Sequence, residues 1–251
     1  MTSSPLCTVR AAVAPLLGDA RISAALTSQL LAGEVATVVE RRGDWLLVRG
    51  QDAYEGWTHA GYLDSVSGTE LTWRLSLGCV VREETGSTRA LPLGARVAPS
   101  ADVVDGSALS AAAVESHFPK ATAAIARSAA GLFAGASYLW GGVTPWGCDC
   151  SGFVQRVFRL HGVGLPRDAW QQASIGIELA RDAGAAHPAG DLLFFSDRDD
   201  ARVTHVGIAL GDARMIHSSL SRGGIAIDRM DSDDAYVAKL RAGCTGVRRV
   251  V

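Results

Sequence analysis

The sequence predicts small all-β barrel domains, followed by a region that combines helices with β-strands. Two observations lead to this fold class. Short strand-like runs with frequent turn residues fill the first part of the chain. Further on, a glycine-rich stretch ends in a cysteine and is followed by a helical pattern and then by apolar strands. We expect three regions: 1–66 as a β domain, 67–110 as a second, reduced β unit with a linker, and 111–251 as the α+β domain.

The composition describes an ordinary soluble globular protein, with 48% hydrophobic and 20% charged residues. A net charge of −2 gives no reason to expect nucleic acid or an anionic membrane as a partner. The five cysteines are odd in number and scattered, which does not indicate a disulfide framework. The N-terminus has no signal-peptide pattern, and no apolar run approaches a membrane span of about 20 residues. We therefore expect a cytoplasmic protein.

The first region shows strand-like segments separated by turns. Segments rich in β-branched and aromatic residues run over Gly33–Glu40, Trp45–Arg49 and Tyr54–Thr58. Their short, regular spacing predicts a small barrel. Residues 18–33 fit this pattern less well, and we expect a helical insertion there.

The second region is again short and strand-like. Its expected strands cover Leu71–Leu77, Gly78–Arg82 and Ala90–Val97, and Asp102–Ser110 is interpreted as a linker. These features favour a reduced second β unit.

The stretch Tyr138–Phe153 supplies the candidate nucleophile, Cys150. Apolar residues after Cys150 recur at steps of three and four as far as Leu160, which predicts a helix. Asp149 or Ser151 can cap that helix, and its N-terminus favours an anion. We therefore expect the pKa of the Cys150 thiol to be lowered, so that the thiolate can attack a carbonyl.

Two alternatives to a nucleophilic Cys150 stay open. A buried structural cysteine before a core helix would give the same local pattern. Cys148 is the rival nucleophile, although it lies in the loop. A metal-binding C-x-C pair lacks a second pair at ligand spacing, so we expect no metal and no cofactor.

Two histidines lie where they could serve the cysteine. His205 and His217 are placed almost symmetrically about the turn at Gly211, so in a hairpin they are cross-strand neighbours on one face. His205 would take the thiol proton, and His217 would orient it. The alternative is two histidines that fill a sheet face. The four remaining histidines are interpreted as surface residues: His59, His117, His161 and His187.

Six motifs in order give the α+β region a specific resemblance: Y-L-W-G-G, D-C-S-G-F, L-P-R-D, G-D-L-L-F-F, T-H-V-G-I and I-H-S. From about 118 to 220 the chain resembles the NlpC-type family of papain-like cell-wall cysteine peptidases. The first region, with G-E-x-V, G-D-W-L-L-V, E-G-W-T and G-Y-L, resembles the bacterial SH3-like domain. Together they resemble the YkfC-type branch, the γ-D-glutamyl-L-diamino acid endopeptidases.

The resemblance implies an α+β papain-like fold, in which the helix that carries the cysteine packs on an antiparallel sheet that carries the histidines. It implies Cys150 as nucleophile, His205 as base and His217 as its orienting residue. It implies cleavage of short murein peptides, tripeptides or tetrapeptides with a free N-terminal L-alanine, in cell-wall recycling. The residues it places around that substrate are Glu34, Tyr54, Tyr138, Trp140, Asp149 and Ser151.

Three of these residues have simpler explanations: Asp149 as a helix cap, Tyr54 as a barrel-core aromatic and Glu34 as a solvated strand end. Two departures concern substrate preference. Ala169 stands where many relatives have serine or threonine, and the gap between Val48 and Tyr54 is short for this branch. Two other functions stay open: an amidase or acyltransferase acting on another amide, and a catalytically silent murein-binding protein.

Overall fold

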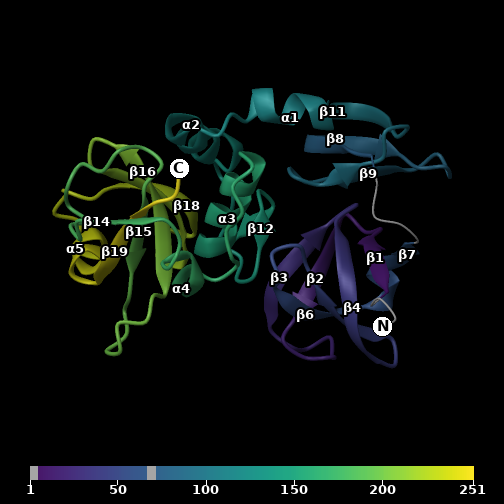
Figure 1. Ribbon diagram of the computed structural model, residues 1–251, viewed down its shortest axis with the longest axis horizontal. Coiled ribbons are helices and arrows are strands. Elements are labelled where there is room, and N and C mark those ends of the chain that lie inside the picture. Colours follow the sequence, from purple (N-terminus) through teal and green to yellow (C-terminus); the bar gives the residue numbers. More distant parts are fainter. Residues whose placement is uncertain (1–4, 67–71) are drawn as a thin grey trace. The chain divides into compact units, whose positions relative to one another are not determined.

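The structure is a computed structural model that describes residues 5–66 and 72–251, and it divides into two compact units. The first unit is Met1–His117 with Trp140–Gly142, and the second is Phe118–Leu139 with Val143–Val251. The first is built mainly from strands, and the second combines helices with an antiparallel sheet (Figure 1).

A seven-stranded antiparallel sheet forms the N-terminal part of the first unit, in the order β3-β2-β6-β5-β4-β1-β7. Alternate residues of these strands are buried, and together they form one apolar core. Its elements are β1 (Leu6–Val9), β2 (Val13–Leu17), β3 (Leu26–Leu31), β4 (Val35–Arg42), β5 (Trp45–Arg49), β6 (Glu55–His59), the short 3-10 helix η1 (Ala60–Tyr62) and β7 (Leu63–Val66).

The expected helical insertion over residues 18–33 is wrong. Gly18 N–H donates to the carbonyl of Ala25 at 3.0 Å, which closes a loop, and β3 follows. Leu30 and Leu31 are buried in or against the barrel, because β3 pairs along β2. Pairing with β2 therefore outweighs the mixed local pattern that suggested a helix.

A second, smaller sheet follows in the first unit, centred on β8. The predicted strand Leu71–Leu77 begins outside the described residues, which omit 67–71. The elements here are β8 (Arg74–Arg82), β9 (Thr88–Leu91), β10 (Arg96–Val97), β11 (Asp102–Ser110) and α1 (Ala111–His117). The interpretation of Asp102–Ser110 as a linker is wrong, since this segment is strand β11 and pairs along β8. Gly106 has φ +70° and lies at an irregularity of that pairing. This irregularity explains why the strand has a sequence typical of a turn.

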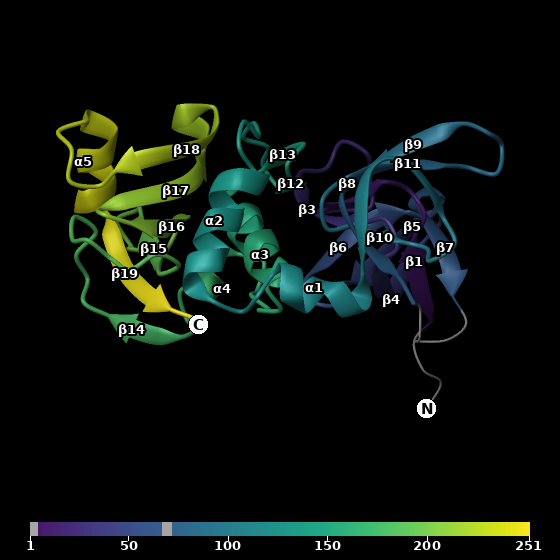
Figure 2. The same ribbon diagram turned by 90° about the horizontal axis from the view of Figure 1, so that it is seen from above.

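The second unit is built on a six-stranded sheet with the order β14-β19-β15-β16-β17-β18, and every pairing in it is antiparallel. Figure 2 shows α5 on one side of this sheet and the α2–α3 pair on the other. Its elements are α2 (Thr122–Leu132), β12 (Val143–Thr144), β13 (Gly147–Cys148), α3 (Cys150–Leu160), α4 (Ala169–Gln172), β14 (Ile177–Leu179), β15 (Leu192–Phe195), β16 (His205–Gly211), β17 (Arg214–Ser219), η2 (Leu220–Arg222), β18 (Gly224–Arg229), α5 (Ala235–Ala242) and β19 (Cys244–Arg249).

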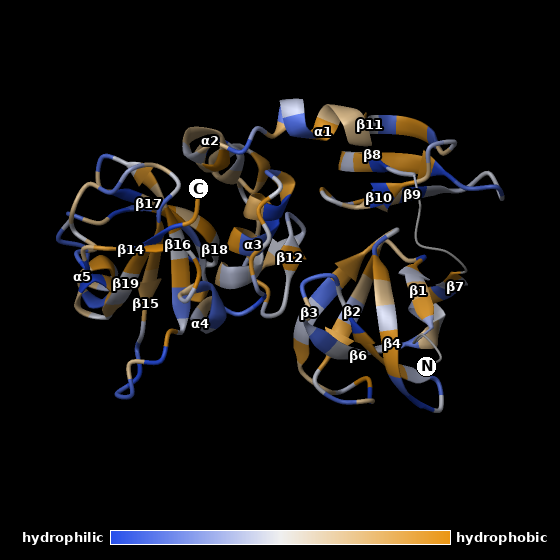
Figure 3. Ribbon diagram, viewed as in Figure 1, coloured by the Kyte–Doolittle hydropathy of each residue, from blue (hydrophilic) through white to orange (hydrophobic). Residues whose placement is uncertain are grey.

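The central strands of this sheet are buried on both faces. All four residues of β15 are buried; Leu193 and Phe195 belong to the core under α5. On the other side α3 packs against β16 and β17. Figure 3 shows the apolar residues concentrated along such strands. A sheet held between two helical layers provides a rigid base for the start of α3.

One histidine does not lie where the sequence suggested. His161 follows α3 and is only 2% exposed, because α2 covers it. Its Nδ1 lies 2.8 Å from the carbonyl oxygen of Pro119, and its Nε2 lies 2.9 Å from Ser128 Oγ. The interpretation of His161 as a surface residue is therefore wrong. His117 is exposed, and His59 and His187 are partly exposed.

Candidate active site

Cys150 is the first residue of α3, as the sequence predicts. The side chain of Asp149 caps the helix by accepting a hydrogen bond from Gly152 N–H at 2.7 Å. The Cys150 thiol is 8% exposed and donates to the carbonyl of Thr204 at 3.9 Å, and the N–H of Val206 also bonds to its sulfur. The sulfur thus lies against the backbone on both sides of His205.

The protonation of Cys150 differs from the expectation. Burial raises the pKa of the thiol to about 12, and the negative charge of Asp149 adds to that rise. The N–H of Val206 and the charge of Arg167 lower the pKa by less. The expected lowering by the helix N-terminus is therefore outweighed, and the resting sulfur is a neutral thiol at neutral pH. An adjacent base has to remove its proton during attack.

His205 and His217 form the predicted imidazole pair. Nε2 of His205 lies 2.7 Å from Nδ1 of His217, and the rings meet edge to face with centroids 5.0 Å apart. The pKa of His205 is lowered to about 3, first by burial and then by the neighbouring His217, while Asp228 acts in the opposite direction. His205 is therefore a neutral imidazole at neutral pH, which is the form that accepts a proton.

Asp228 extends the pair and was not predicted from the sequence. Its Oδ2 lies 3.0 Å from Nε2 of His217. Strand β18 pairs with β17 so that His217 opposes Ala226, which makes Asp228 the diagonal neighbour of His217. Strand alternation in G-G-I-A-I-D could have indicated this contact, had the pairing of the two strands been known.

A buried ion pair holds the start of α3. Arg167 donates from NH2 to Asp149 Oδ2 at 2.6 Å and from NH1 to Oδ1 at 3.0 Å, with Arg167 2% and Asp149 8% exposed at the side chain. Arg167 NH1 also donates to Ser151 Oγ at 2.9 Å. Arg167 lies in the motif L-P-R-D, but no role was predicted for it from the sequence. Asp149 is therefore both the predicted cap and the partner of a buried cation.

The other predicted substrate residues are distributed over both units. Tyr138 is half-buried in the second unit, where burial and the nearby Cys150 and Asp149 raise the pKa of its phenol. Trp140 is 66% exposed and groups with the first unit.

Glu34 and Tyr54 lie in the first unit. Glu34 is 3% exposed, and its Oε2 accepts a hydrogen bond from Leu31 N–H at 3.0 Å, so its interpretation as a solvated strand end is wrong. Tyr54 packs against the barrel core, as the core-aromatic alternative expects.

Cys148 has a different environment from Cys150. It lies in β13, its side chain is completely buried, and burial raises the pKa of its thiol to about 12. Its carbonyl oxygen accepts a hydrogen bond from Ser218 Oγ at 2.6 Å. Cys148 is therefore buried in the interior beside the site, and the choice of Cys150 over Cys148 as nucleophile stays a prediction.

Two further kinds of feature are absent from the described part of the chain. In residues 5–66 and 72–251, no group of three or more His, Cys, Asp or Glu side chains could hold a metal ion. No helix in the same ranges is long and apolar enough to cross a membrane.

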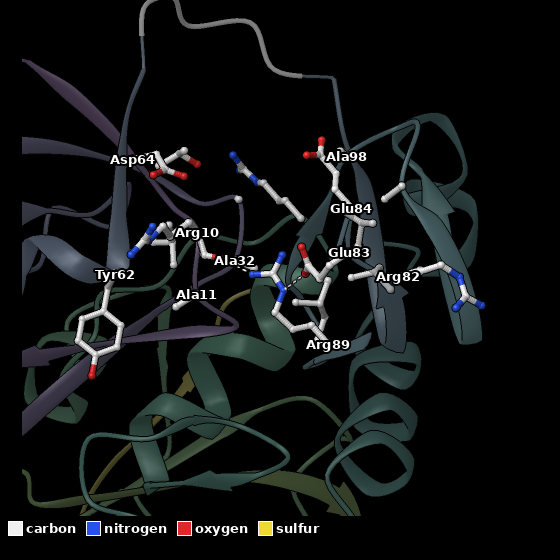
Figure 4. Close-up of a pocket in the computed structure, with 18 of the residues that line it drawn as sticks. Arg10, Ala11, Ala32, Tyr62, Asp64, Arg82, Glu83, Glu84, Arg89 and Ala98 are labelled. Carbon is white, nitrogen blue, oxygen red and sulfur yellow. Dashed lines mark hydrogen bonds and ion pairs between the residues drawn. The ribbon is translucent and has the colours of Figure 1, made fainter. Parts of the chain in front are cut away.

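A cavity of about 1070 Å³ lies within the first unit (Figure 4). Figure 4 shows Arg10 and Arg89 projecting into it from the two sheets, with Glu83 beside Arg89. Arg89 Nε lies 2.6 Å from Glu83 Oε1, and Arg10 Nε donates to the carbonyl of Gly61 at 2.8 Å. Among the described residues that line the cavity, none is a cysteine or a histidine. It therefore lacks the nucleophile and base that define the candidate active site.

Known proteins resemble both units. Residues 135–241 match the NlpC/P60 family, and residues 16–60 match the bacterial dipeptidyl-peptidase SH3 domain. A Gamma-D-glutamyl-L-lysine dipeptidyl-peptidase of Bacillus subtilis (strain 168) is 40% identical over 97 residues, 38% of this chain and 32% of that protein. A relative of the same name from Bacillus cereus is 26% identical over 241 residues, 80% of this chain and 70% of the relative. The chain thus matches about a third of the length of the first relative.

A solved structure shares the fold. The crystal structure of an NlpC/P60 family protein from Bacillus cereus ATCC 10987 matches with a TM-score of 0.78 at 21% identity, over 98% of this chain and 99% of that chain. The predicted fold class, a papain-like domain preceded by an SH3-like all-β domain, is confirmed. The chain is therefore a cysteine peptidase with an NlpC/P60 domain, whose matched segment 135–241 contains Cys150, His205 and His217, preceded by a bacterial dipeptidyl-peptidase SH3 domain.

Proposed function

We propose that this protein is a cysteine endopeptidase that hydrolyses the bond between γ-D-glutamate and a diamino acid in short murein peptides with a free N-terminal L-alanine. The observation that carries the proposal is the 2.7 Å contact between His205 and His217, beside a sulfur that lies against Thr204 and Val206. Support for the bond comes from the two Bacillus relatives, both named Gamma-D-glutamyl-L-lysine dipeptidyl-peptidase.

The reaction uses one nucleophile and one base. The Cys150 proton passes to His205 as the sulfur attacks the γ-glutamyl carbonyl, and the Cys150 backbone N–H donates to the developing oxyanion. The C–N bond then breaks as His205 returns the proton to the amine of the diamino acid, which leaves a thioester on Cys150. Water, deprotonated by His205, hydrolyses that thioester and regenerates the thiol.

Substrate selection in this proposal relies on the ammonium of L-alanine. A buried ammonium requires carboxylate partners, and Asp149 and Glu34 are the candidates. The resemblance also predicts substrate contacts for Tyr54, Tyr138, Trp140 and Ser151. Because Asp149 also pairs with Arg167, its contribution is that of a carboxylate whose charge is partly compensated.

Mass spectrometry of products tests the proposal. The substrate is L-Ala-γ-D-Glu-diaminopimelate, compared with its lysine analogue, its N-acetylated form and cross-linked murein. We expect release of the free diamino acid and L-Ala-D-Glu, loss of turnover in Cys150→Ala, and retained turnover in the matched variant Cys148→Ala. Undiminished activity of Cys150→Ala would overturn the scheme.

The same assay separates the two other functions. An amidase or acyltransferase would leave the murein peptide intact and cleave a lipid or simple peptide amide instead. A silent murein-binding protein would bind the peptide without releasing any product, whatever the state of Cys150.

A role in recycling of cell-wall peptides in the cytoplasm is part of the proposal. The short peptides that the enzyme would cleave are products of wall turnover. Fractionation of cells that produce the tagged full-length protein, with a known cytoplasmic and a known exported marker, tests this compartment. Recovery with the exported marker would contradict it.

A further inference from the structure

A line of hydrogen bonds connects the base of the site to a carboxylate. It runs from Nε2 of His205 to Nδ1 of His217 at 2.7 Å, and from Nε2 of His217 to Oδ2 of Asp228 at 3.0 Å. The side chain of His217 is fully buried, and that of Asp228 is 12% exposed. The hydrogen bond between His217 and Asp228 is therefore largely shielded from water.

The chemistry of these groups restricts where the protons lie. An ionised carboxylate only accepts hydrogen bonds, so Nε2 of His217 has to carry a proton. In the neutral form of His217 that this proposal uses, Nδ1 carries no proton and accepts the proton on Nε2 of His205. A neutral His205 in that tautomer leaves Nδ1 unprotonated, and Nδ1 is the nitrogen available to the Cys150 thiol.

We propose that Asp228 is a positioning residue of the active site, whose carboxylate fixes the tautomers of His217 and His205 so that Nδ1 of His205 remains the proton acceptor for Cys150. This proposal rests on the proposed peptidase function for its kinetic consequences. Its structural part, the proton positions, concerns the free enzyme and does not depend on the substrate.

Asp228 is itself held in place. Arg222 donates to both of its carboxylate oxygens, from NH2 to Oδ1 at 3.0 Å and from Nε to Oδ2 at 3.3 Å. Arg222 also donates to Asp234 at 2.9 Å, and Asp234 caps α5. The hydrogen bond with His217 and then the bonds with Arg222 lower the pKa of Asp228, although burial opposes them. The carboxylate therefore stays ionised over the working pH range, as the tautomer argument requires.

The ring of His217 has a defined environment on its other sides. Tyr236 of α5 stacks on it with centroids 6.1 Å apart, and the Tyr236 hydroxyl lies 2.7 Å from Ser219 Oγ. Arg222 lies over the same tyrosine ring at 4.9 Å. The charged or titratable groups around His217 are thus His205, Asp228, Arg222 and Tyr236. These contacts restrict rotation of the ring, which holds Nδ1 toward His205 and Nε2 toward Asp228.

Nitrogen-15 NMR of histidine-labelled wild-type protein tests the proton positions directly. We expect His217 and His205 both to be protonated at Nε2 and bare at Nδ1 near neutral pH. In Asp228→Asn, whose amide can also donate, we expect these tautomers to become mixed. A wild-type His205 protonated at Nδ1, or unchanged tautomers in Asp228→Asn, would overturn the proposal, and the wild-type measurement requires no variant to fold.

Kinetics on the murein tripeptide test the consequence. Asp228→Asn should lower kcat by about 10- to 100-fold and change KM by less than threefold. Activity losses of this size are typical when a residue that orients a functional histidine by a hydrogen bond is replaced. Asp228→Glu should recover part of kcat. The matched control is Asp231→Asn, which removes an exposed carboxylate paired with Arg229 and should leave kcat unchanged. Asp228→Asn at wild-type kcat would refute the positioning role, whereas an inactive wild type with the expected tautomers would refute only the proposed substrate.

Discussion

At the scale of single residues, the thiol of Cys150 and the imidazole of His205 are both uncharged in the resting site. Burial raises the pKa of Cys150 and lowers that of His205, so both hold their uncharged forms between about pH 4 and 8. The helix N-terminus suggested a preformed thiolate, but a low-dielectric environment and the adjacent Asp149 act more strongly. Proton transfer therefore belongs to the attack step.

The reactivity of Cys150 should follow from its raised pKa. We expect alkylation of the free enzyme by iodoacetamide to increase with pH and to reach half of its maximum above pH 9, because the ordinary thiol pKa of about 8.5 is raised. Asp149→Asn should alkylate faster at pH 8, since the charge that raises the pKa is removed. Peptide mass spectrometry measures the rate, with Cys148 as the buried internal control. A plateau near pH 7 would contradict the neutral thiol.

The lowered pKa of His205 should appear in stability at acid pH. The unfolded state takes up a proton near pH 6.5, whereas folded His205 does so only near 3, so stability decreases as the pH falls below about 6.5. Between pH 7 and 5 the wild type should lose about 1–2 kcal/mol more unfolding free energy than His205→Gln. Urea denaturation at the two pH values gives both quantities. Equal losses in the two proteins would argue against a neutral buried His205.

At the scale of elements, the sequence was informative wherever local pattern decides structure. The steps of three and four after Cys150 predicted α3, and the turn at Gly211 predicted the hairpin that joins the two histidines. Predictions from local pattern were wrong where contacts between distant segments determine the structure. The burial of His161 depends on α2, and strand β11 depends on β8.

The same distinction explains which site residues were missed. Asp228 reaches His217 through the pairing of β17 with β18, and Arg167 reaches Asp149 from the segment before α4. Neither contact leaves a local signal at the residue itself. The roles predicted for Glu34, Tyr54, Tyr138 and Trp140 stay predictions, because they concern a bound substrate.

The ion pair at the start of α3 should be important for stability. Arg167→Met leaves Asp149 buried without its cation, and we expect a loss of about 3–5 kcal/mol in unfolding free energy. The double variant Asp149→Asn with Arg167→Met should lose less than the single Arg167→Met variant, since no buried charge remains unpaired. The control is Arg198→Met in the exposed pair with Asp200, which should not change the denaturation midpoint measurably. A single variant as stable as this control would contradict the assignment.

At the scale of the whole molecule, the chain joins an SH3 domain to a peptidase domain, and the proposed function assigns each a part. The peptidase domain supplies the chemistry through Cys150. The first unit would supply selection through the buried carboxylate of Glu34. A mutation in the first unit should therefore be able to change substrate selection without changing the rate at which the bond is cleaved.

Glu34→Gln tests whether Glu34 recognises the substrate ammonium. The variant keeps an oxygen for Leu31 N–H but removes the negative charge, so we expect KM for the free-amine tripeptide to rise by about tenfold, the loss of one charge-assisted bond. Cleavage of the N-acetylated tripeptide, slow in the wild type, should not fall further. Glu55→Gln, at an exposed pair with Arg49, is the matched control. Equal effects of Glu34→Gln on both substrates would exclude amine recognition by Glu34.

The β16–β17 turn has a consequence for how this enzyme can vary. His205, His217 and Asp228 come from three successive strands, and Asp212 and Ala213 hold left-handed conformations at φ 52° and 55° where the first two strands meet. Neighbouring side chains of a strand alternate between the two faces of the sheet. A one-residue insertion in this turn that shifts the strand register would therefore place His217 and Asp228 on the opposite face from His205. Loop length is therefore as constrained here as side-chain identity, and natural variants should change the turn sequence without changing its number of residues.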